Sequence, residues 1–201
     1  ADKSIGYIKL NRFAASSTDE FKEALKTLDK KGMKKLILDL QGNGGGYLNI
    51  AIELADEFLS RGKQIVYTQG YKQKRQDAIS TTQGSFEDGE LVILVDESSA
   101  SASEILSGAV QDWDRGVIVG RRTFGKGLVQ RPLPLPDGSM IRLTVARYYT
   151  PTGRCIQKPY EKGKGEDYAH DLIDRYNRGE LMSADSIHFP DSMKYSTLAN
   201  G

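Results

Sequence analysis

The sequence is poor in the residue types that most often perform catalysis or cross-link a small fold. It has one cysteine, Cys155, and two histidines, His170 and His188, in 201 residues. A single cysteine excludes an internal disulfide and a cysteine-based structural zinc site. The sequence has no HExxH pair and no close cluster of histidine with carboxylates. It therefore predicts no bound metal and no other cofactor.

Long apolar runs and an excess of one charge are also missing. No stretch approaches the roughly 20 apolar residues of a membrane span, and residues 1–10 lack the apolar region of a secretory signal. Lys and Arg total 28 against 27 Asp and Glu, which gives a formal charge of +1. We expect no membrane span in this chain, and the charge balance gives no reason to expect nucleic acid as a partner.

What is present is an alternation of short apolar strands and amphipathic helices. Helices are predicted after the first, second and fourth of the expected strands, which lie at residues 5–10, 35–40, 64–68, 91–95, 117–120 and 140–149. This order predicts an α/β domain with layers of helices on a mostly parallel sheet.

Local signals add detail to this plan. Ser17 and Glu20 form a capping-box pattern that predicts the start of the first helix. Residues 71–90 are polar and predict a long surface loop. Within 140–149, we expect Ile141, Leu143 and Val145 to point inward. After Pro159 the chain is polar, with one short helix expected at 168–176, and we expect this tail to be peripheral.

Two glycine-rich segments suggest anion binding. The first, QGNGGGY at 41–47, follows a strand but fails the dinucleotide spacing, because Tyr47 or Asn49 stands where the third glycine belongs. A tight turn and an oxyanion site both remain open for it. The second, GRRTFGKG at 120–127, resembles a phosphate-binding loop. Gly127 replaces the hydroxyl residue that holds magnesium, and the following LVQRPLPLP cannot form a helix, so nucleotide binding is a weak alternative.

The third cluster, SSASASE at 98–104, lies at the turn from a buried strand into a helix. It fits either a serine-rich helix cap or an exposed nucleophile. Both histidines lie in the polar tail, so a histidine-based triad would draw its base from the least core-like part of the chain. A lysine can serve instead if an apolar pocket keeps its amine neutral. Lys126, between two glycines and near Phe124, has neighbours that permit close packing.

The same segments resemble the C-terminal processing, or tail-specific, peptidases of the S41 family. The stretch from 99 to 130, SASASEILSGAVQDWDRGVIVGRRTFGKGLVQ, is similar to that family's nucleophile and lysine block. ARYYTPTGRCIQ at 146–157 and LILDLQGNGGGYL at 36–48 resemble further family segments. The resemblance covers about residues 5–160 and implies a crotonase- or ClpP-like core.

Carried over by position, the resemblance implies Ser101 as the nucleophile, Lys126 as the general base and Gln130 as a residue that orients the lysine. Candidate oxyanion donors are the backbone N–H groups of Ala102 and of Gly45 or Gly46.

Asp112 matches a family position linked to activity. It lies about 16 Å of helix rise from Ser101, so we assign it a supporting role: an anchor of the helix end, a partner of Arg115 or Arg121, or a plain surface carboxylate. Gln130 would lie about 13 Å from Lys126 along a straight strand, which predicts a bend near Gly127.

Two departures from the family pattern stand out. Gln41 to Gly44 read QGNG where the family has RNNP, so the path of this loop is open. A PDZ domain, which family members usually carry before the entry strand, is expected to be absent from this chain. We expect a catalytic core at 1–160 and an extension at 161–201 packed on or peripheral to it.

The resulting hypothesis is a serine endopeptidase with a Ser/Lys dyad that cleaves near the C-terminal region of proteins. Its partners would be proteins or peptides with accessible C-termini, and a homo-oligomer is left open. The resemblance implies a location in the periplasm or cell envelope, with a signal or anchor segment trimmed. A non-catalytic binder of peptide tails is the alternative of another class.

Overall fold

The computed structural model describes residues 2–81, 83–160, 163 and 165–201. Its strands are β1 (Ile5–Lys9), β2 (Lys35–Asp39), β3 (Gln64–Gln69), β4 (Gln76–Ile79), β5 (Glu90–Val95), β6 (Val117–Gly120), β7 (Leu128–Pro134) and β8 (Met140–Tyr149). Its helices are α1 (Ser17–Asp29), α2 (Leu48–Asp56), α3 (Ala102–Asp112) and α4 (Gly165–Asn177), followed by 3₁₀ turns at Ala184–Ser186 and Asp191–Met193.

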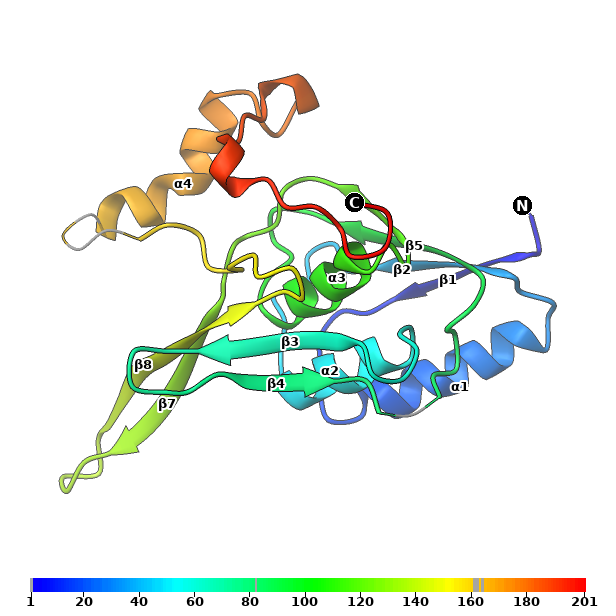
Figure 1. Cartoon of the computed structure of the whole chain (residues 1–201), viewed down its shortest axis with the longest axis horizontal. Coiled ribbons are helices and arrows are strands. Elements are labelled where there is room, and N and C mark those ends of the chain that lie inside the picture. Colours follow the sequence, from blue (N-terminus) through cyan, green and yellow to red (C-terminus); the bar gives the residue numbers. More distant parts are fainter. Residues whose placement is uncertain (1, 82, 161–162, 164) are drawn as a thin grey trace.

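A parallel four-stranded sheet, ordered β1-β2-β5-β6, confirms the predicted α/β plan. Successive strands of this sheet are joined through α1, through α2 with the β3–β4 hairpin, and through α3, so the connections fit parallel pairing. Leu36, Leu38 and Ile93 of the central strands are buried with Phe21, Leu54 and other apolar residues of the helices in one core. Figure 1 shows the strands and helices of this unit.

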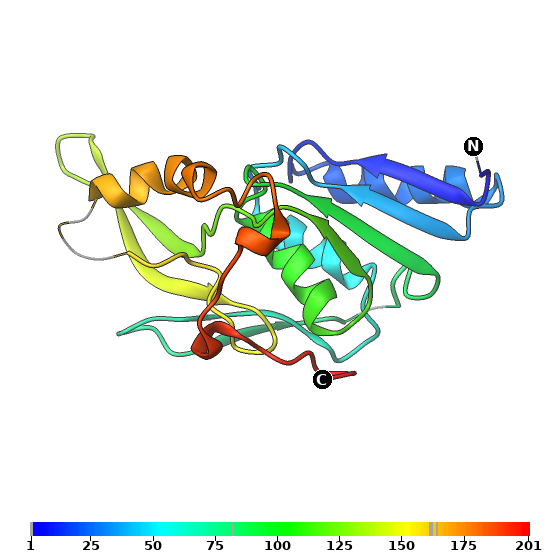
Figure 2. The ribbon, with the colours of Figure 1, turned by 90° about the horizontal axis from the view of Figure 1, so that it is seen from above.

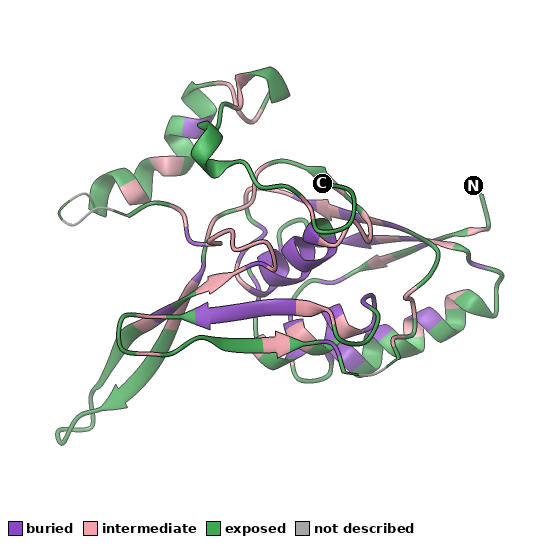
Figure 3. Cartoon of the chain, in the orientation of Figure 1, coloured by how far each residue is buried: buried purple, intermediate pink, exposed green. Residues whose placement is uncertain are grey.

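A second, antiparallel sheet, ordered β4-β3-β8-β7, was not predicted. Its strand β3 contacts both α2 and α3, so these helices lie between the two sheets, as Figure 2 shows from above. All but one of the 11 residues of α3 are buried, and the helix is among the most buried elements in Figure 3. The helix that begins next to Ser101 is therefore packed over most of its surface.

The strand β4 corrects the prediction of a continuous loop at 71–90. It pairs antiparallel with β3 and forms a hairpin. Its residues are largely exposed and only Ala78 packs against the core, so it lacks the apolar alternation that identifies a half-buried strand.

The β7–β8 hairpin corrects the expected orientation of residues 141–145. Ile141 and Leu143 are 49% and 48% exposed rather than buried. The hairpin extends away from the layers, with both faces toward solvent (Figures 1 and 3). Pro132 and Pro134 are tolerated in β7 because it is an edge strand.

The capping box expected at Ser17 is also wrong. Ser16 occupies the N-cap of α1, and the Ser17 hydroxyl instead donates to the carbonyl of Arg12 and accepts from the N–H of Ala14. These bonds close the turn before the helix, so the hydroxyl is not available to cap it.

The tail contains a longer helix than expected, α4, followed by a strand-free segment that returns to α3. The N–H of Leu198 donates to the carbonyl of Asp112, and Figure 1 shows α4 outside the layered core. Among the described helices, none combines the length and the apolar character that a membrane crossing requires.

Candidate active site

The site lies at the carboxyl ends of β2 and β5, which are parallel neighbours. In such a sheet the loops that follow adjacent strands meet at one edge, where ligands commonly bind. Here the glycine-rich loop, residues 40–47 after β2, meets the serine turn, residues 96–101 after β5. The N–H of Gly42 donates to both carboxylate oxygens of Asp96 at 3.0 Å, and the Ser99 hydroxyl donates to the carbonyl of Leu40 at 2.8 Å.

Asn43 fixes the path of the glycine-rich loop. Its side chain is fully buried, donates to the carbonyl of Leu10 at 2.7 Å and accepts from the N–H of Gly45 at 2.9 Å. Its own carbonyl accepts from the N–H of Ala100 and the hydroxyl of Ser103. One asparagine, which no sequence pattern indicated, thus joins the entry strand, the loop and the serine turn.

Gly45 allows the loop to approach the serine turn closely. Its φ is +98°, and a Cβ atom there would lie 2.7 Å from the carbonyl oxygen of Ala100 and 2.9 Å from Cβ of Ser101. Its N–H is already bonded to Asn43. In this structure Gly45 therefore serves close packing, and its N–H is not free to bind an oxyanion.

Gly46 presents a different geometry. The N–H of Phe13 donates to the carbonyl of Gly45, and the carbonyl of Phe13 accepts from the N–H of Tyr47. In a parallel bridge of this kind, the N–H of the middle residue points away from the partner strand. The N–H of Gly46 is therefore directed away from Phe13 and stays a candidate oxyanion donor.

Ser101 occupies the N-cap of α3 with φ 56° and ψ −109°. A non-glycine residue with positive φ is uncommon, and such strained residues gather at functional sites. Ala102 is the first residue of α3, so its N–H has no acceptor within the helix. The turn thus brings a hydroxyl residue and a backbone donor that has no acceptor within the helix to the same end of α3.

Lys126 lies on the loop between β6 and β7, residues 121–127, which we call the lysine loop. This loop packs closely against residues 156–158. A Cβ at Gly125 would lie 2.7 Å from Cβ of Lys158, and one at Gly127 would lie 2.4 Å from the N of Gln157. The flanking glycines therefore permit close packing, as expected. The side chain of Lys126 is exposed, and no hydrogen bond joins it to Ser101 in the described part of the chain. The expected apolar pocket around the amine is not formed.

Glu104, for which the sequence indicated no role, connects the serine turn to the lysine loop. Its Oε2 accepts from the N–H groups of Ser101 at 2.8 Å and Lys126 at 2.9 Å. Its Oε1 accepts from the Thr123 hydroxyl at 2.7 Å and the N–H of Gly125 at 2.6 Å. The spacing of Ser101 and Glu104, which is that of a capping box, is the signal that could have identified this residue.

Burial raises the pKa of Glu104, although hydrogen bonds from Lys126, Thr123, Ser101 and Gly125 act in the opposite direction. The cause is desolvation, because the residue is buried between α3 and the lysine loop. Its four donors satisfy both carboxylate oxygens, which compensates much of the cost of burying a charge.

Asp39, at the end of β2, is a second buried carboxylate near the loop. Burial alone would raise its pKa, but the Tyr7 hydroxyl, the N–H of Gln41 and the ammonium of Lys9 bind it and hold the pKa below its ordinary value. These bonds fix the first residue of the loop, where Gln41 replaces the arginine of the family pattern.

Gln130 lies exposed in β7. No hydrogen bond joins it to Lys126 among the described residues. A β-bulge occurs beside it, because Val129 pairs with Ala146 while Gln130 pairs with Thr144, leaving Val145 as the extra residue. This irregularity lies on the partner strand rather than at Gly127, so an orienting role for Gln130 stays a prediction.

The structure corrects the expected partners of Asp112. The residue is 3% exposed, and its carboxylate binds the Arg154 guanidinium at 2.9 Å and accepts from the N–H and hydroxyl of Thr152. Arg115 instead donates to backbone carbonyls, including that of Phe58 at 3.0 Å, and Arg121 pairs with Glu97. The alternative of a surface carboxylate is wrong, and the alternative of an anchor at the helix end fits: Asp112 holds the turn after β8 against the end of α3.

The alternatives of a histidine base, a metal site and a nucleotide site find no support among the described residues. His170 and His188 are exposed in the tail. Within the described ranges, no group of three His, Cys, Asp or Glu side chains is placed to hold a metal ion. The loop after β6 leads into the strand β7 and not into a helix, so it lacks the helix N-terminus of a nucleotide-binding loop.

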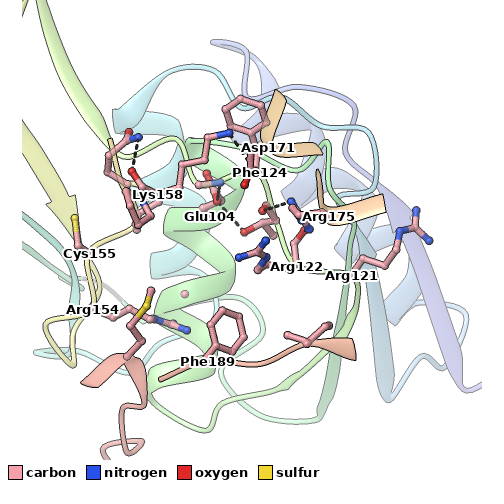
Figure 4. Close-up of a pocket in the computed structure, with 18 of the residues that line it drawn as sticks. Glu104, Arg121, Arg122, Phe124, Arg154, Cys155, Lys158, Asp171, Arg175 and Phe189 are labelled. Carbon is pink, nitrogen blue, oxygen red and sulfur yellow. Dashed lines mark hydrogen bonds and ion pairs between the residues drawn. The ribbon is translucent and has the colours of Figure 1, made fainter. Parts of the chain in front are cut away.

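A cavity of about 760 Å³ lies between α3, the loop at 120–125 and the tail. Figure 4 shows this cavity, with Glu104, Phe124, Lys158 and Arg175 among its labelled lining residues. Neither Ser101 nor Lys126 lines it. Glu104 therefore separates the cavity from the serine turn.

Comparison with known proteins identifies relatives of this chain. The profile of peptidase family S41 matches residues 4–168. A carboxyl-terminal-processing protease from Picosynechococcus sp. is 43% identical over 156 residues, which cover 78% of this chain and 37% of that protein. A "Probable CtpA-like serine protease" from Staphylococcus aureus is 38% identical over 164 residues, 80% of this chain and 32% of that protein.

A solved structure extends the similarity to three dimensions. The photosystem II D1 C-terminal processing protease superposes with a TM-score of 0.72 at 38% identity, over 76% of this chain and 39% of that one. The chain spans about a third of the length of the curated relatives it matches. The family match over most of the chain and the identity to these relatives show that the chain belongs to peptidase family S41.

Proposed function

We propose that this chain is the catalytic core of a serine peptidase in which Ser101 attacks the peptide carbonyl and Lys126 removes its proton. The observation that carries the proposal is the shared carboxylate of Glu104, to which the backbone N–H groups of both residues are bonded. The strained backbone of Ser101 at the start of a buried helix supports the same role.

The reaction is an acyl transfer. The neutral amine of Lys126 takes the hydroxyl proton of Ser101, and the oxygen bonds to the substrate carbonyl carbon. The peptide C–N bond then breaks, the amine product leaves with the proton, and water hydrolyses the acyl enzyme. The N–H groups of Ala102 and Gly46 face the developing oxyanion, and each donor of this type typically contributes about 3 kcal/mol to transition-state binding.

The exposure of Lys126 sets a condition on this mechanism. A lysine acts as a base only when its amine is neutral, and removal from water favours the neutral form. Lys126 is exposed in the free chain, so in our proposal the ligand bound over Ser101, whether a peptide or an acylating probe, covers the amine. Gln130, on the strand that begins beside this loop, would orient the lysine in that complex.

We propose as substrates the C-terminal regions of proteins, because the relatives include carboxyl-terminal-processing proteases. Ser101→Ala and Lys126→Ala should each abolish cleavage of an unstructured peptide. Ser98→Ala, in the same turn, and Lys72→Ala, at another exposed lysine, are matched controls that should cleave normally.

Circular dichroism should show that all four variants are folded. Peptide binding by the wild-type chain with no cleavage would favour the tail-binding alternative over the enzyme.

Location and assembly remain predictions. The family resemblance suggests the periplasm or cell envelope, which cell fractionation would test. Recovery of the protein only in the cytosolic fraction would contradict it. Light scattering on the purified chain would decide between a monomer and a homo-oligomer.

A further inference from the structure

The largest fully buried side chain belongs to the tail. Arg175 of α4 is only 2% exposed, and it lies beyond residues 4–168 matched by the family profile. Its two terminal nitrogens donate to the backbone carbonyls of Arg122 and Thr123. These two residues belong to the loop that carries Lys126.

The charge of Arg175 is compensated by a nearby carboxylate. Glu180 lies 3.5 Å from Nε of Arg175 and 2.9 Å from the guanidinium of Arg122, and it also binds the exposed Arg178. Burying an unpaired guanidinium would be costly. Nε of Arg175 makes no hydrogen bond among the described residues, so Glu180 acts on it only as an ion pair at 3.5 Å, while the two terminal nitrogens donate to the loop.

The lysine loop is thus held from two sides. Arg175 of the tail donates to the carbonyls of Arg122 and Thr123. Glu104 of α3 accepts from the N–H groups of Gly125 and Lys126. The guanidinium therefore binds the first part of the loop through backbone carbonyls, and the carboxylate binds the later part through backbone N–H groups. Glu104 thus links the backbone of Lys126 to that of Ser101, and Arg175 adds an anchor from the tail to the preceding residues of the same loop.

A second contact with the tail involves Phe124, which lies between Thr123 and Gly125. The ammonium of Lys158 donates to the Asp171 carboxylate and to the carbonyl of Tyr168. It also lies 4.6 Å from the ring centre of Phe124 and 4.1 Å from that of Tyr168. Figure 4 shows Arg175, Lys158 and Asp171 around the cavity beside this loop. The first turns of α4 therefore hold Phe124 while its last turn holds Arg122.

We infer that Arg175 of α4 is a positioning residue for Lys126. This inference rests on the proposed function, because it assigns Arg175 to the placement of the general base. Displacement of a catalytic group by about 1 Å can cost up to roughly 100-fold in rate, so loss of the clamp should be visible in the chemical step.

The test uses the whole chain and a fluorophosphonate probe that reacts with activated serines. Arg175→Met should slow labelling of Ser101 at least about tenfold, with little change in the KM for a peptide substrate. Arg175→Lys keeps the charge but cannot reproduce both hydrogen bonds of the guanidinium. Its rate of Ser101 labelling should lie between those of Arg175→Met and the wild type. Arg178→Ala removes another arginine bound to Glu180 and should label at the wild-type rate.

Hydrogen exchange separates this inference from the proposed function. Arg175→Met should accelerate amide exchange over residues 122–126 and leave exchange over α2 unchanged, whether or not the probe reacts. Wild-type labelling rates with unchanged exchange in both Arg175 variants would overturn the inference. If Arg175→Met fails to fold, the test rests on Arg175→Lys. Labelling of Ser101 at the wild-type rate in that variant would then overturn the inference. A wild-type chain whose Ser101 is never labelled would contradict the proposed function instead.

Discussion

Ser101 and Lys126 donate their backbone N–H groups to the same oxygen, Oε2 of Glu104, at 2.8 Å and 2.9 Å. The two backbone nitrogens therefore lie no farther apart than the sum of these two bond lengths. The relationship is independent of the side-chain conformation of Lys126, so the loop stays close to the serine turn even while the amine is exposed to solvent.

Glu104→Gln should impair both folding stability and cleavage. A glutamine amide presents two donors toward N–H and O–H groups that now donate to a carboxylate, so at least one of these groups loses its acceptor. We expect a loss of about 1 to 3 kcal/mol in the free energy of unfolding and a large fall in kcat/KM. Urea denaturation and peptide cleavage measure the two effects. Glu23→Gln, on the exposed face of α1, should change neither.

The same variant has a defined pH dependence. Burial raises the pKa of Glu104 above its ordinary value of 4.5, so the folded chain keeps this proton to a higher pH than the unfolded chain. The contribution of Glu104 to the free energy of unfolding is therefore fully present below pH 4.5, and it is lost as the pH rises through the raised pKa. The stability advantage of the wild type over Glu104→Gln should shrink over that interval. An advantage that grows with pH there would contradict this account.

Gly45→Ala should damage the site more than an equivalent substitution elsewhere. Gly45 and Gly32 have φ values of +98° and +88°, so alanine at either position adopts a strained backbone at a cost of about 1 to 2 kcal/mol. At Gly32 a Cβ meets no atom within 4 Å, whereas at Gly45 it collides with the serine turn. Thermal unfolding should show the larger loss for Gly45→Ala. Only this variant should lose peptidase activity, and normal cleavage would argue against the close approach of the two loops.

Arg154→Gln should reveal the structural role of Asp112. It removes the cationic partner of a buried carboxylate, and we expect a loss of about 1 to 3 kcal/mol in the free energy of unfolding. Arg121→Gln breaks an exposed ion pair with Glu97 and should cost less than about 1 kcal/mol. Chemical denaturation of the two variants gives the comparison. Equal effects would contradict the buried anchoring role.

Much of the layered core could be predicted from the sequence, because its strands and helices have strong periodic patterns. The alternation around Leu36 and Leu38 and the helical pattern of Ile105 and Ala109 reflect direct burial. The β7–β8 hairpin has a similar alternation at Ile141 and Leu143, yet these side chains are exposed. Periodicity indicates a strand, but it does not show whether a core exists for that strand to cover.

The candidate site was predictable only in part for a related reason. Ser101 and Lys126 were singled out by resemblance and by the scarcity of histidine. Their link through Glu104 depends on a buried carboxylate, which composition normally assigns to the surface. Arg175 was missed because polar tails are usually solvated, and its burial depends on a loop far away in the sequence. Such pairings of polar groups leave no periodic signal.

The rate at which a fluorophosphonate modifies Ser101, followed by mass spectrometry in the wild type and in Lys126→Ala, tests the central claim most directly. If Lys126 is the general base, labelling should be confined to Ser101 and should slow at least about 100-fold in the folded variant. Labelling at the same rate with and without Lys126 would contradict the claim.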